Sequence, residues 1–411
     1  MIFSPKGMIK TGLDAALLMA GQNRDALKLI RTQTSARDLS PRTPTEQDLR
    51  RVIDWIKRAQ DSSSTGGVAW GFRARQRIRS SHEVGWEGAY PETTGYIIET
   101  MIRFGRIYND SDSVTRALRM ADWECSIQLS DGGIQGGIYH QGETGAPSTF
   151  VTGQVIFGWL AAYRHTHEEK YLRAARRAGD WLLSCLDDQG RFVKGYSLFC
   201  APGPKAYEAR TAWALALVGS TTGDKKYIDA AHNICSFSAR CQTPNGWFEQ
   251  NDLNEHDKPL THTIGYVLEG MMETAMVTKD GSWVTPVLTT LDRLLTLIAP
   301  NGFLAGRWYR DWKPAVDWAC LTGSSQIAGV YLRMHHRLNI PIFEVAAQKL
   351  LGFVTATQLQ HGYHPGLVGA IHGSYPFSGD YGRECVLNWA GKFFADSVLD
   401  FLNPNSSDTR D

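Results

Sequence analysis

The chain has 411 residues, of which 43% are hydrophobic and 21% charged, and its formal net charge is +1. This composition excludes a disordered or fibrous chain, and the charge gives no overall attraction to nucleic acid or to an anionic membrane. The seven cysteines include no CxxC pair, and the amino terminus has neither an adequate apolar run nor a cleavage site. We therefore expect a cytoplasmic protein with reduced thiols and no membrane span.

A short pattern first appears in AQDSSSTGG and recurs at the end of five further amphipathic segments, as IQLSDGG, CLDDQG, CQTPNG, IAPNG and TQLQHG. A glycine in the left-handed conformation commonly ends a helix, so each copy predicts a helix C-terminus. Successive copies are 56 to 66 residues apart, which indicates an internal repeat. The glycines are Gly66, Gly132, Gly190, Gly246, Gly302 and Gly362.

A second pattern lies between the copies of the first. It is a pair such as Thr94-Gly95 or Thr152-Gly153, and it opens runs with apolar residues at helical spacing, such as YIIETMIRF and QVIFGWLAAY. A sixth run, CVLNWAGKFFADSVLDFL, lacks the glycine. Small residues at these positions allow neighbouring helices to approach closely. The two patterns together divide the chain into six helix pairs.

The repeat predicts charged outer helices over 46–60, 112–128, 168–186, 225–242, 283–298 and 341–358. It predicts mostly apolar inner helices over 91–108, 149–165, 207–221, 261–278, 320–337 and 382–401. We expect residues 46–411 to form one all-α toroid, with an open solenoid as the alternative. Residues 1–45 are expected to form a helical extension, which either covers the ring or makes an oligomer contact.

Connections between the predicted helices alternate in length. The turns from inner to outer helices are short, whereas the loops from outer to inner helices are long, the longest being 61–90, 299–319 and 359–381. Long loops are where binding and catalysis concentrate. These loops all lead to the N-termini of inner helices, whose dipoles favour anions or developing negative charge. One face of the toroid is therefore the predicted working face.

Polar residues at the starts of the inner helices are the catalytic candidates. They must either face a wet cavity or be paired, and several carboxylates around one cavity suit acid/base chemistry because burial separates their pKa values. The alternative is that they are helix caps and salt bridges. His262 and Tyr266 share a helix face, as a base and an acid or as a satisfied hydrogen bond. The candidates are Glu92, Glu208, His262, Tyr266, Asp317 and Glu384.

Aromatic side chains in the long loops suit stacking on sugar rings, and arginines or amides beside them suit binding of polar groups. About half of the aromatic residues are expected to be loop packing instead. The candidate substrate-binding residues are Trp70, Trp86, Tyr90, Tyr207, Arg210, Trp247, Trp308, Gln326, Tyr375 and Arg383.

The recurring QxxxG pattern and the six helix pairs resemble the (α/α)6 toroid superfamily. Its members include glycoside hydrolases, polysaccharide lyases, sugar epimerases, terpene cyclases and protein prenyltransferase β subunits. The stretches WIKRAQDSSSTGGVAWGF, YPETTGYII and LNWAGKFFADSVL resemble proteins encoded in bacterial exopolysaccharide gene clusters. The segment FVTGQVIFGWLAAYRHTHEEKYLRAARRAGDWL is similar to the helical domain of glucuronyl C5-epimerases. The resemblance implies a carbohydrate-active enzyme of exopolysaccharide assembly.

Other branches of the superfamily lack their motifs here. There is no DxDD acid motif of terpene cyclases and no Cys-His-Gly motif of lanthionine cyclases. A zinc site of Asp317, Cys320 and Cys385 is a minor alternative to buried packing of both cysteines. We therefore expect neither a resident metal nor a cofactor.

The sequence thus predicts an enzyme that cleaves a bacterial exopolysaccharide or its oligosaccharide precursor, as a hydrolase or a lyase. The arginines favour an acidic glycan. One alternative is a uronate C5-epimerase, in which His262 or a tyrosine removes the proton and Arg210 or Arg383 holds the carboxylate. The non-enzymatic alternative is a glycan-binding scaffold that associates peripherally with a biosynthetic complex.

Overall fold

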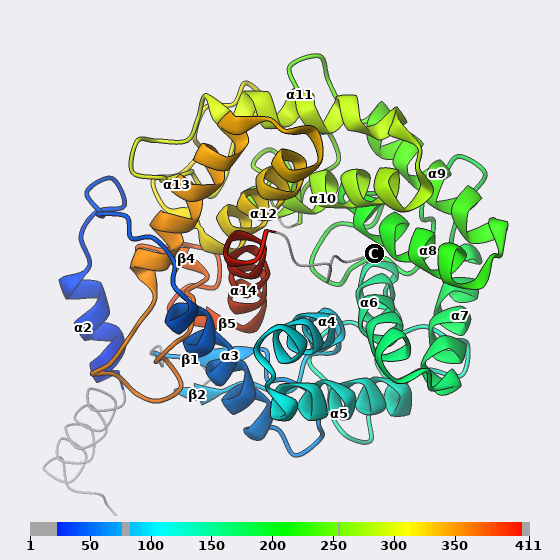
Figure 1. Ribbon diagram of the computed structural model, residues 1–411, viewed down its shortest axis with the longest axis horizontal. Coiled ribbons are helices and arrows are strands. Elements are labelled where there is room, and N and C mark those ends of the chain that lie inside the picture. Colours follow the sequence, from blue (N-terminus) through cyan, green and yellow to red (C-terminus); the bar gives the residue numbers. More distant parts are fainter. Residues whose placement is uncertain (1–22, 76–82, 254, 405–411) are drawn as a thin grey trace, which may run out of the picture.

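The computed structural model describes residues 23–75, 83–253 and 255–404. Within these ranges the helices form two concentric rings (Figure 1). The outer helices are α3 (Glu46–Asp61), α5 (Ser111–Ile127), α7 (Glu169–Leu183), α9 (Lys225–Arg240), α11 (Val284–Leu295) and α13 (Pro341–Thr357). The inner helices are α4 (Pro91–Tyr108), α6 (Thr149–Thr166), α8 (Ala209–Thr222), α10 (Thr261–Thr278), α12 (Leu321–Leu338) and α14 (Asn388–Leu402). The predicted (α/α)6 toroid is confirmed.

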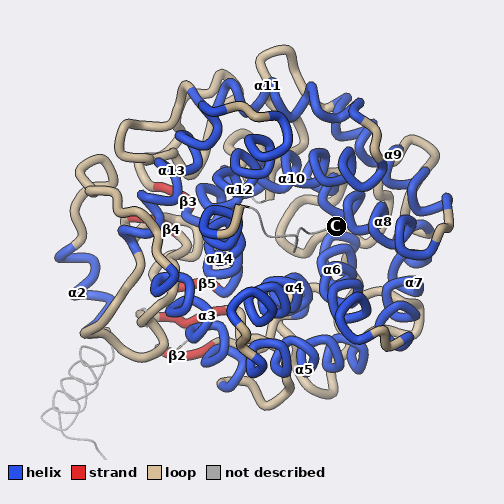
Figure 2. Tube along the Cα trace, viewed as in Figure 1, coloured by secondary structure: helices blue, strands red, loops and turns tan. Residues whose placement is uncertain are grey.

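Short strands lie in the loops that lead to the inner helices (Figure 2). Strand β1 (Gly71–Arg73) lies between β2 (Gly85–Trp86) and β5 (Cys385–Leu387), and β3 (Ala319–Cys320) pairs with β4 (Ser374–Tyr375). Two 3-10 turns, Ala206–Glu208 and Gly281–Trp283, precede α8 and α11. Helix α2 (Arg24–Thr32) lies outside the rings, and its Lys28 donates to the Gly362 carbonyl at 3.1 Å.

Helix boundaries follow local capping chemistry. Helix α3 starts at a capping box, in which Thr45 and Asp48 satisfy each other's backbone N–H groups. Five inner helices end in a residue with left-handed φ, which reverses the chain within a few residues and explains the short turns to the outer helices. These residues are Asn109, His167, Gly223, Lys279 and Asn339.

The sixth inner helix differs from the prediction, which placed it over 382–401. It begins at Asn388, because residues Cys385–Leu387 form strand β5 and pair with β1, Phe72 lying opposite Val386. The apolar run that reads as helix thus starts with three buried strand residues. A pairing partner more than 300 residues away in the chain overrides the local helical pattern.

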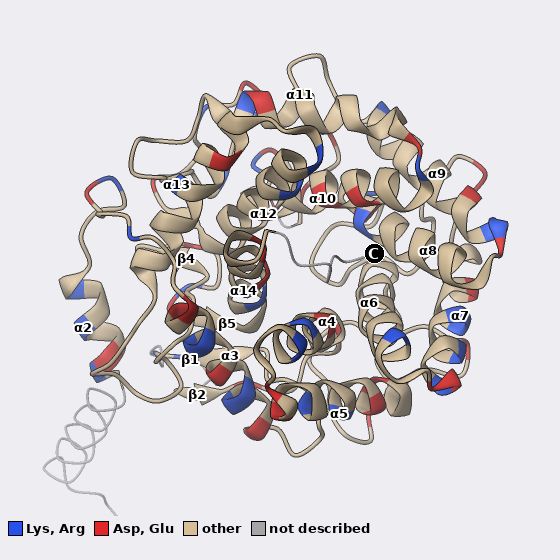
Figure 3. Cartoon of the chain, viewed as in Figure 1, with Lys and Arg blue, Asp and Glu red and all other residues tan. Residues whose placement is uncertain are grey.

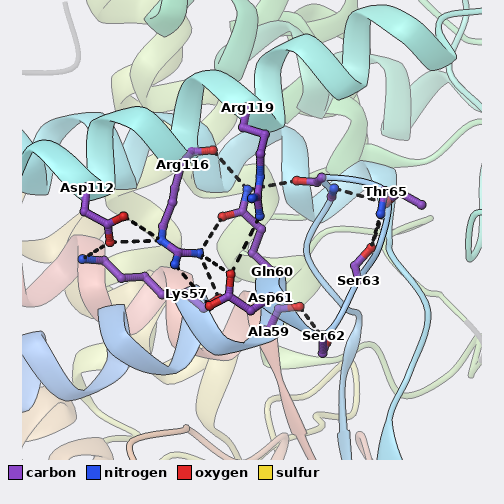
Figure 4. A network of polar contacts seen from close by, with 12 residues as sticks. Lys57, Ala59, Gln60, Asp61, Ser62, Ser63, Thr65, Asp112, Arg116 and Arg119 are labelled. Carbon is purple, nitrogen blue, oxygen red and sulfur yellow. Dashed lines mark hydrogen bonds and ion pairs between the residues drawn. The ribbon is translucent and has the colours of Figure 1, made fainter.

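A glutamine at the end of several outer helices joins one repeat to the next. The Gln60 side-chain amide donates to the carbonyl of Gly66 at 2.9 Å and to that of Arg116, on α5, at 3.1 Å. Figure 4 shows this contact beside the Arg116 guanidinium, which also pairs with Asp61 and Asp112. The repeated glutamine therefore donates to a backbone carbonyl in the glycine-containing pattern that ends its own helix, and to a second carbonyl in the next helix pair.

The same contact closes the ring. Gln358, at the end of α13, donates to the carbonyl of Asp48 in α3 at 3.0 Å and to that of Gly369 at 3.0 Å. The last outer helix is thereby bonded to the first, and α14 packs against both α3 and α4. A linear solenoid would leave these faces exposed, so the contacts establish a closed toroid.

Neighbouring inner helices approach each other closely at the small residues of the second pattern. A Cβ atom added to Gly95 would lie 2.5 Å from the Cα atom of Val155 on α6, and one added to Gly323 would lie 2.6 Å from the backbone nitrogen of His262 on α10. Charged residues lie mainly on the outer ring and the loops, with a smaller set on the inner helices (Figure 3). No helix in the described ranges is apolar over enough length to span a membrane.

Candidate active site

A cavity of about 350 Å³ lies at the N-terminal ends of the inner helices. Tyr90 precedes α4, Phe150 lies in the first turn of α6, Tyr207 lies just before α8 and His262 lies in the first turn of α10. The cavity is thus built where the long loops deliver the chain. Its lining consists of Trp70, Tyr90, Glu92, Phe150, Ser197, Phe199, Tyr207, Leu253, Leu260, His262, Tyr266, Tyr381 and Trp389.

Glu92 is the one carboxylate among these lining residues. It follows Pro91 at the start of α4, and its Oε2 accepts a weak hydrogen bond from the Tyr90 hydroxyl at 3.4 Å. Burial raises the pKa of Glu92 to about 7; Tyr90 and the Arg210 charge oppose this rise and the Glu208 charge adds to it. A large share of the Glu92 carboxyls is therefore protonated at neutral pH.

His262 provides the complementary group, a neutral imidazole. The Gln326 side-chain oxygen lies 2.5 Å from its Nδ1. An amide oxygen only accepts, so Nδ1 carries the proton and Nε2 keeps its lone pair. Burial lowers the pKa of His262 to about 3. The Tyr266 ring packs on the imidazole at 4.2 Å between centroids, so the polar partner of His262 is Gln326 and not Tyr266.

Glu208 lies behind the cavity wall, outside its lining. One carboxylate oxygen accepts from the Thr149 hydroxyl at 2.8 Å and the other from the Thr211 hydroxyl at 2.6 Å. Burial raises its pKa to about 7, and the two hydroxyls oppose this rise. Because the Glu208 charge also raises the pKa of Glu92, the two carboxyls lie within electrostatic reach of each other.

Arg210 lies beneath the cavity and is fully engaged. Its Nε donates to Gln154 Oε1 at 2.6 Å, and its guanidinium forms an ion pair with Glu269. Only 1% of the residue is exposed. Five aromatic rings surround the guanidinium at 5.2 to 5.8 Å, those of Tyr96, Phe157, Trp213, Tyr266 and Phe393. Arg210 therefore stabilises the packing of the inner helices beneath the cavity. This buried, charged layer is here called the floor of the cavity.

Further ion pairs extend this floor across the ring. Arg333 on α12 contacts Glu269 and Glu273 on α10 and Asp400 on α14, and Asp400 also contacts Arg103 on α4. With the Arg210–Gln154 contact, the network reaches all six inner helices. Arg333, Asp400 and Arg103 lie in the C-terminal halves of their helices, so the paired charges occupy the side of the ring opposite the cavity mouth.

A comparison with known protein families identifies the family to which the chain belongs. The model of the beta-L-arabinofuranosidase GH127 catalytic domain matches residues 22–299, about two thirds of the sequence. The chain belongs to the GH127 family. It is a carbohydrate-active enzyme. No curated protein sequence matches it significantly.

Solved structures that resemble the GH127 enzyme share its fold at low sequence identity. An unsaturated glucuronyl hydrolase specific for heparin has a TM-score of 0.68 and 12% identity, covering 87% of this chain and 97% of that one. Cellobiose 2-epimerase from Bacillus thermoamylovorans B4167 has a TM-score of 0.67 and 10% identity, covering 86% and 98%. The unsaturated glucuronyl hydrolase from Bacillus sp. GL1 has a TM-score of 0.66 and 13% identity, covering 87% and 96%. These similarities establish the toroid fold alone.

The structure of the GH127 enzyme brings about half of the sequence candidates together. Six line the cavity, namely Trp70, Tyr90, Glu92, Tyr207, His262 and Tyr266. Three more are buried directly behind these residues through the contacts described above, namely Glu208, Arg210 and Gln326.

Asp317, Arg383 and Glu384 lie away from the cavity. Asp317 is exposed because the adjoining strand β3 pairs with β4 and Trp318 points inward, which turns the preceding side chain outward. Asp317 and Arg383 line a separate surface depression. Glu384 forms an ion pair with Arg75 at 2.7 Å. Among the described residues, Asp317, Cys320 and Cys385 do not form a metal-binding group.

Four aromatic candidates are packing residues of the loops. Trp86 packs on Trp55 at 5.4 Å, and the Trp308 indole donates to the Thr261 hydroxyl at 2.9 Å. Trp247 packs edge-on against a neighbouring tryptophan, and the Tyr375 hydroxyl bonds to a threonine of the N-terminal segment. These contacts match the expectation that part of the aromatic set is loop packing.

Sequence reasoning missed several residues of the cavity wall. Phe150 stands two residues before the Thr152-Gly153 pair of the second pattern, where an aromatic residue at a helix start is the available signal. Tyr381 and Trp389 were missed because the sixth inner helix was predicted to start six residues too early, which placed Arg383 and Glu384 at its first turn instead of Trp389. The remaining missed residues are Ser197, Phe199, Leu253 and Leu260.

Proposed function

We propose that this GH127 enzyme hydrolyses the glycosidic bond of a neutral sugar residue bound in the cavity. Glu92 is the general acid and His262 the general base. The observation that carries the proposal is that Glu92 and His262 line the same cavity, where burial raises the pKa of the carboxyl to about 7 and lowers that of the imidazole to about 3. Acid/base hydrolysis requires one group that gives a proton and one that accepts it.

In the proposed step, Glu92 gives its proton to the glycosidic oxygen as the bond from that oxygen to the anomeric carbon breaks. A water molecule attacks the anomeric carbon, and its proton goes to Nε2 of His262. The cavity then holds a carboxylate and an imidazolium, so its net charge is unchanged. This pairing offsets the weak basicity of His262, since each new charge stabilises the other in a poorly solvated site. Exchange with solvent restores both groups.

A neutral substrate fits the charges around the cavity. Among the described residues, no lysine or arginine lines the cavity, and Arg210 is committed to Glu269 and Gln154. A uronate carboxylate would therefore lie near Glu92 without a cation among the described lining residues to pair with, at a substantial desolvation cost. This argues against the acidic glycan expected from the sequence, and against a lyase that must hold a uronate. The family description names a neutral pentofuranose, which is consistent with this proposal.

Sugar epimerisation is the second candidate. Within the described ranges, Glu92 is the one carboxylate that lines the cavity, whereas many glycoside hydrolases place two beside the bond. The same acid and base could remove a proton from carbon and return one to it. An origin of the substrate in exopolysaccharide assembly stays a hypothesis under either reaction.

A panel of aryl glycosides and short oligosaccharides, including β-L-arabinofuranosides, tests the proposal in D2O buffer. We expect release of one sugar without deuterium at carbon. Glu92→Gln and His262→Gln should each lower kcat by about 100-fold or more. Asp317→Asn, which alters an exposed carboxylate outside the cavity, is the matched control and should retain full activity. Deuterium on carbon without bond cleavage identifies the epimerase instead. Full activity in both cavity variants would refute the assigned roles.

A further inference from the structure

Two neighbouring apolar side chains are exposed beside the cavity. Leu198 and Phe199 have 61% and 53% of their surface exposed. Both belong to the loop between α7 and the 3-10 turn before α8. Phe199 also lines the cavity, together with its neighbour Ser197. The exposed patch, here called the mouth patch, is thus continuous with the proposed catalytic cavity.

The loop holds the mouth patch in place at both ends. The Gly195 carbonyl accepts from the backbone nitrogen of Thr149 at 2.8 Å, which fixes the loop to the start of α6. Cys200 lies 3.5 Å from the Tyr207 hydroxyl, and the Phe199 backbone nitrogen donates to the Ser197 hydroxyl at 3.2 Å. The apolar side chains therefore project from an anchored turn. Exposed, contiguous apolar groups beside a binding cavity indicate a surface that a ligand covers.

From this geometry we infer that the mouth patch is the subsite for the leaving group of the substrate, and that it binds an apolar leaving group. The inference rests on the proposed function. Glu92 and His262 both line the cavity, and the paired charges of the floor occupy the opposite side of the ring. The part of a glycoside beyond the scissile bond therefore extends outward past Phe199. There it meets phenyl and aliphatic side chains, which favour an alkyl or aryl group over a second, hydroxyl-covered sugar.

Paired glycosides that differ only in the leaving group test this inference. Octyl and methyl β-L-arabinofuranosides, and octyl and methyl β-glucosides, are titrated against the Glu92→Gln variant, with tryptophan fluorescence as the readout because Trp70 and Trp389 line the cavity. We expect each octyl glycoside to bind at least about tenfold more tightly than its methyl partner. Leu198→Ser should bring this ratio close to one and leave binding of the methyl glycosides within about twofold, and Phe199→Ala should lower the ratio as well. Phenyl glycosides then distinguish an aryl from an alkyl preference.

Ile342→Ala is the matched control, since Ile342 is 54% exposed on the outer helix α13. It should leave the octyl-to-methyl ratio unchanged. An equal affinity for octyl and methyl glycosides, or stronger binding of a disaccharide than of the octyl glycosides, overturns the inference. A parent protein that is a dimer, and that Phe199→Ala converts to a monomer, also overturns it by assigning the patch to a second copy. If octyl binding depends on Phe199 but no glycoside is cleaved, the proposed hydrolysis fails while the subsite stands.

Discussion

Gln326 accepts the Nδ1 proton of His262 at 2.5 Å, and this contact joins α12 to α10 in the wall of the cavity. Both residues are at least nine-tenths buried, so water does not compete for the bond. The contact selects one tautomer of His262 and leaves Nε2 free to accept a proton. Gln326 is therefore a positioning residue for the proposed base, acting through His262 and not on the substrate.

Replacing Gln326 tests this role. Gln326→Leu should lower kcat by about 10- to 1000-fold with little change in KM, because the base loses its fixed tautomer while the lining stays intact. Gln326→Glu should instead raise the pKa of His262, since a carboxylate beside an imidazole stabilises the imidazolium. The acidic limb of the pH–rate profile then moves to higher pH. An unchanged limb in Gln326→Glu and unchanged kcat in Gln326→Leu would show that the contact is structural only.

The decrease of kcat at alkaline pH should reflect the loss of the proton from Glu92. As the general acid it must be protonated, and its pKa is about 7, so kcat should be highest below pH 7 and fall as the pH rises through that value. Glu208→Gln removes a nearby negative charge that raises the pKa of Glu92, so the decrease should move to lower pH. A pH–rate profile of both proteins measures this. A shift in the opposite direction contradicts the electrostatic link between the carboxyls.

Buried carboxyls should also make folding stability depend on pH. The pKa of Glu208 is about 7 in the folded protein, above the ordinary value of 4.5, so the folded state prefers the protonated form. This contribution is fully present below pH 4.5 and is lost as the pH rises through about 7, by up to about 3 kcal/mol. Urea unfolding at pH 5 and pH 8 should show the parent losing more stability than Glu208→Gln. An equal loss in both proteins assigns the effect to other groups.

Hydrogen bonds that close the ring, where α13 meets α3, should contribute more to thermal stability than equivalent bonds between consecutive helix pairs. Gln358→Ala removes two buried hydrogen bonds that tie α13 to α3 and to the following loop, at a cost of about 1–3 kcal/mol. Gln128→Ala removes the equivalent pair within the ring, together with an exposed hydrogen bond from Arg177, and is the control. Thermal unfolding measures both. We expect Gln358→Ala to lower Tm more, because neighbours in sequence stay close without the bond while the two ends of the ring do not.

The sequence determined the helices and their order, because the signals for them are local. Apolar periodicity and glycine stop signals depend on residues a few positions apart, so the predicted inner helix over 261–278 coincides with α10. The six-fold repeat then implied the closed ring and the common face of the inner helix N-termini. This placed Glu92, His262 and Tyr266 in the cavity wall, since a polar residue at the start of an inner helix has few other places to point.

Only the tertiary structure decided which polar residues are available for chemistry. Arg210 reads as a ligand for a carboxylate, yet Glu269 and Gln154, both more than 50 residues away, engage it completely. Trp389 reaches the cavity because β5 pairs with β1 and delays the start of α14. Such contacts depend on segments brought together by closure of the ring, and burial among them, rather than local pattern, sets the pKa of each carboxyl and imidazole.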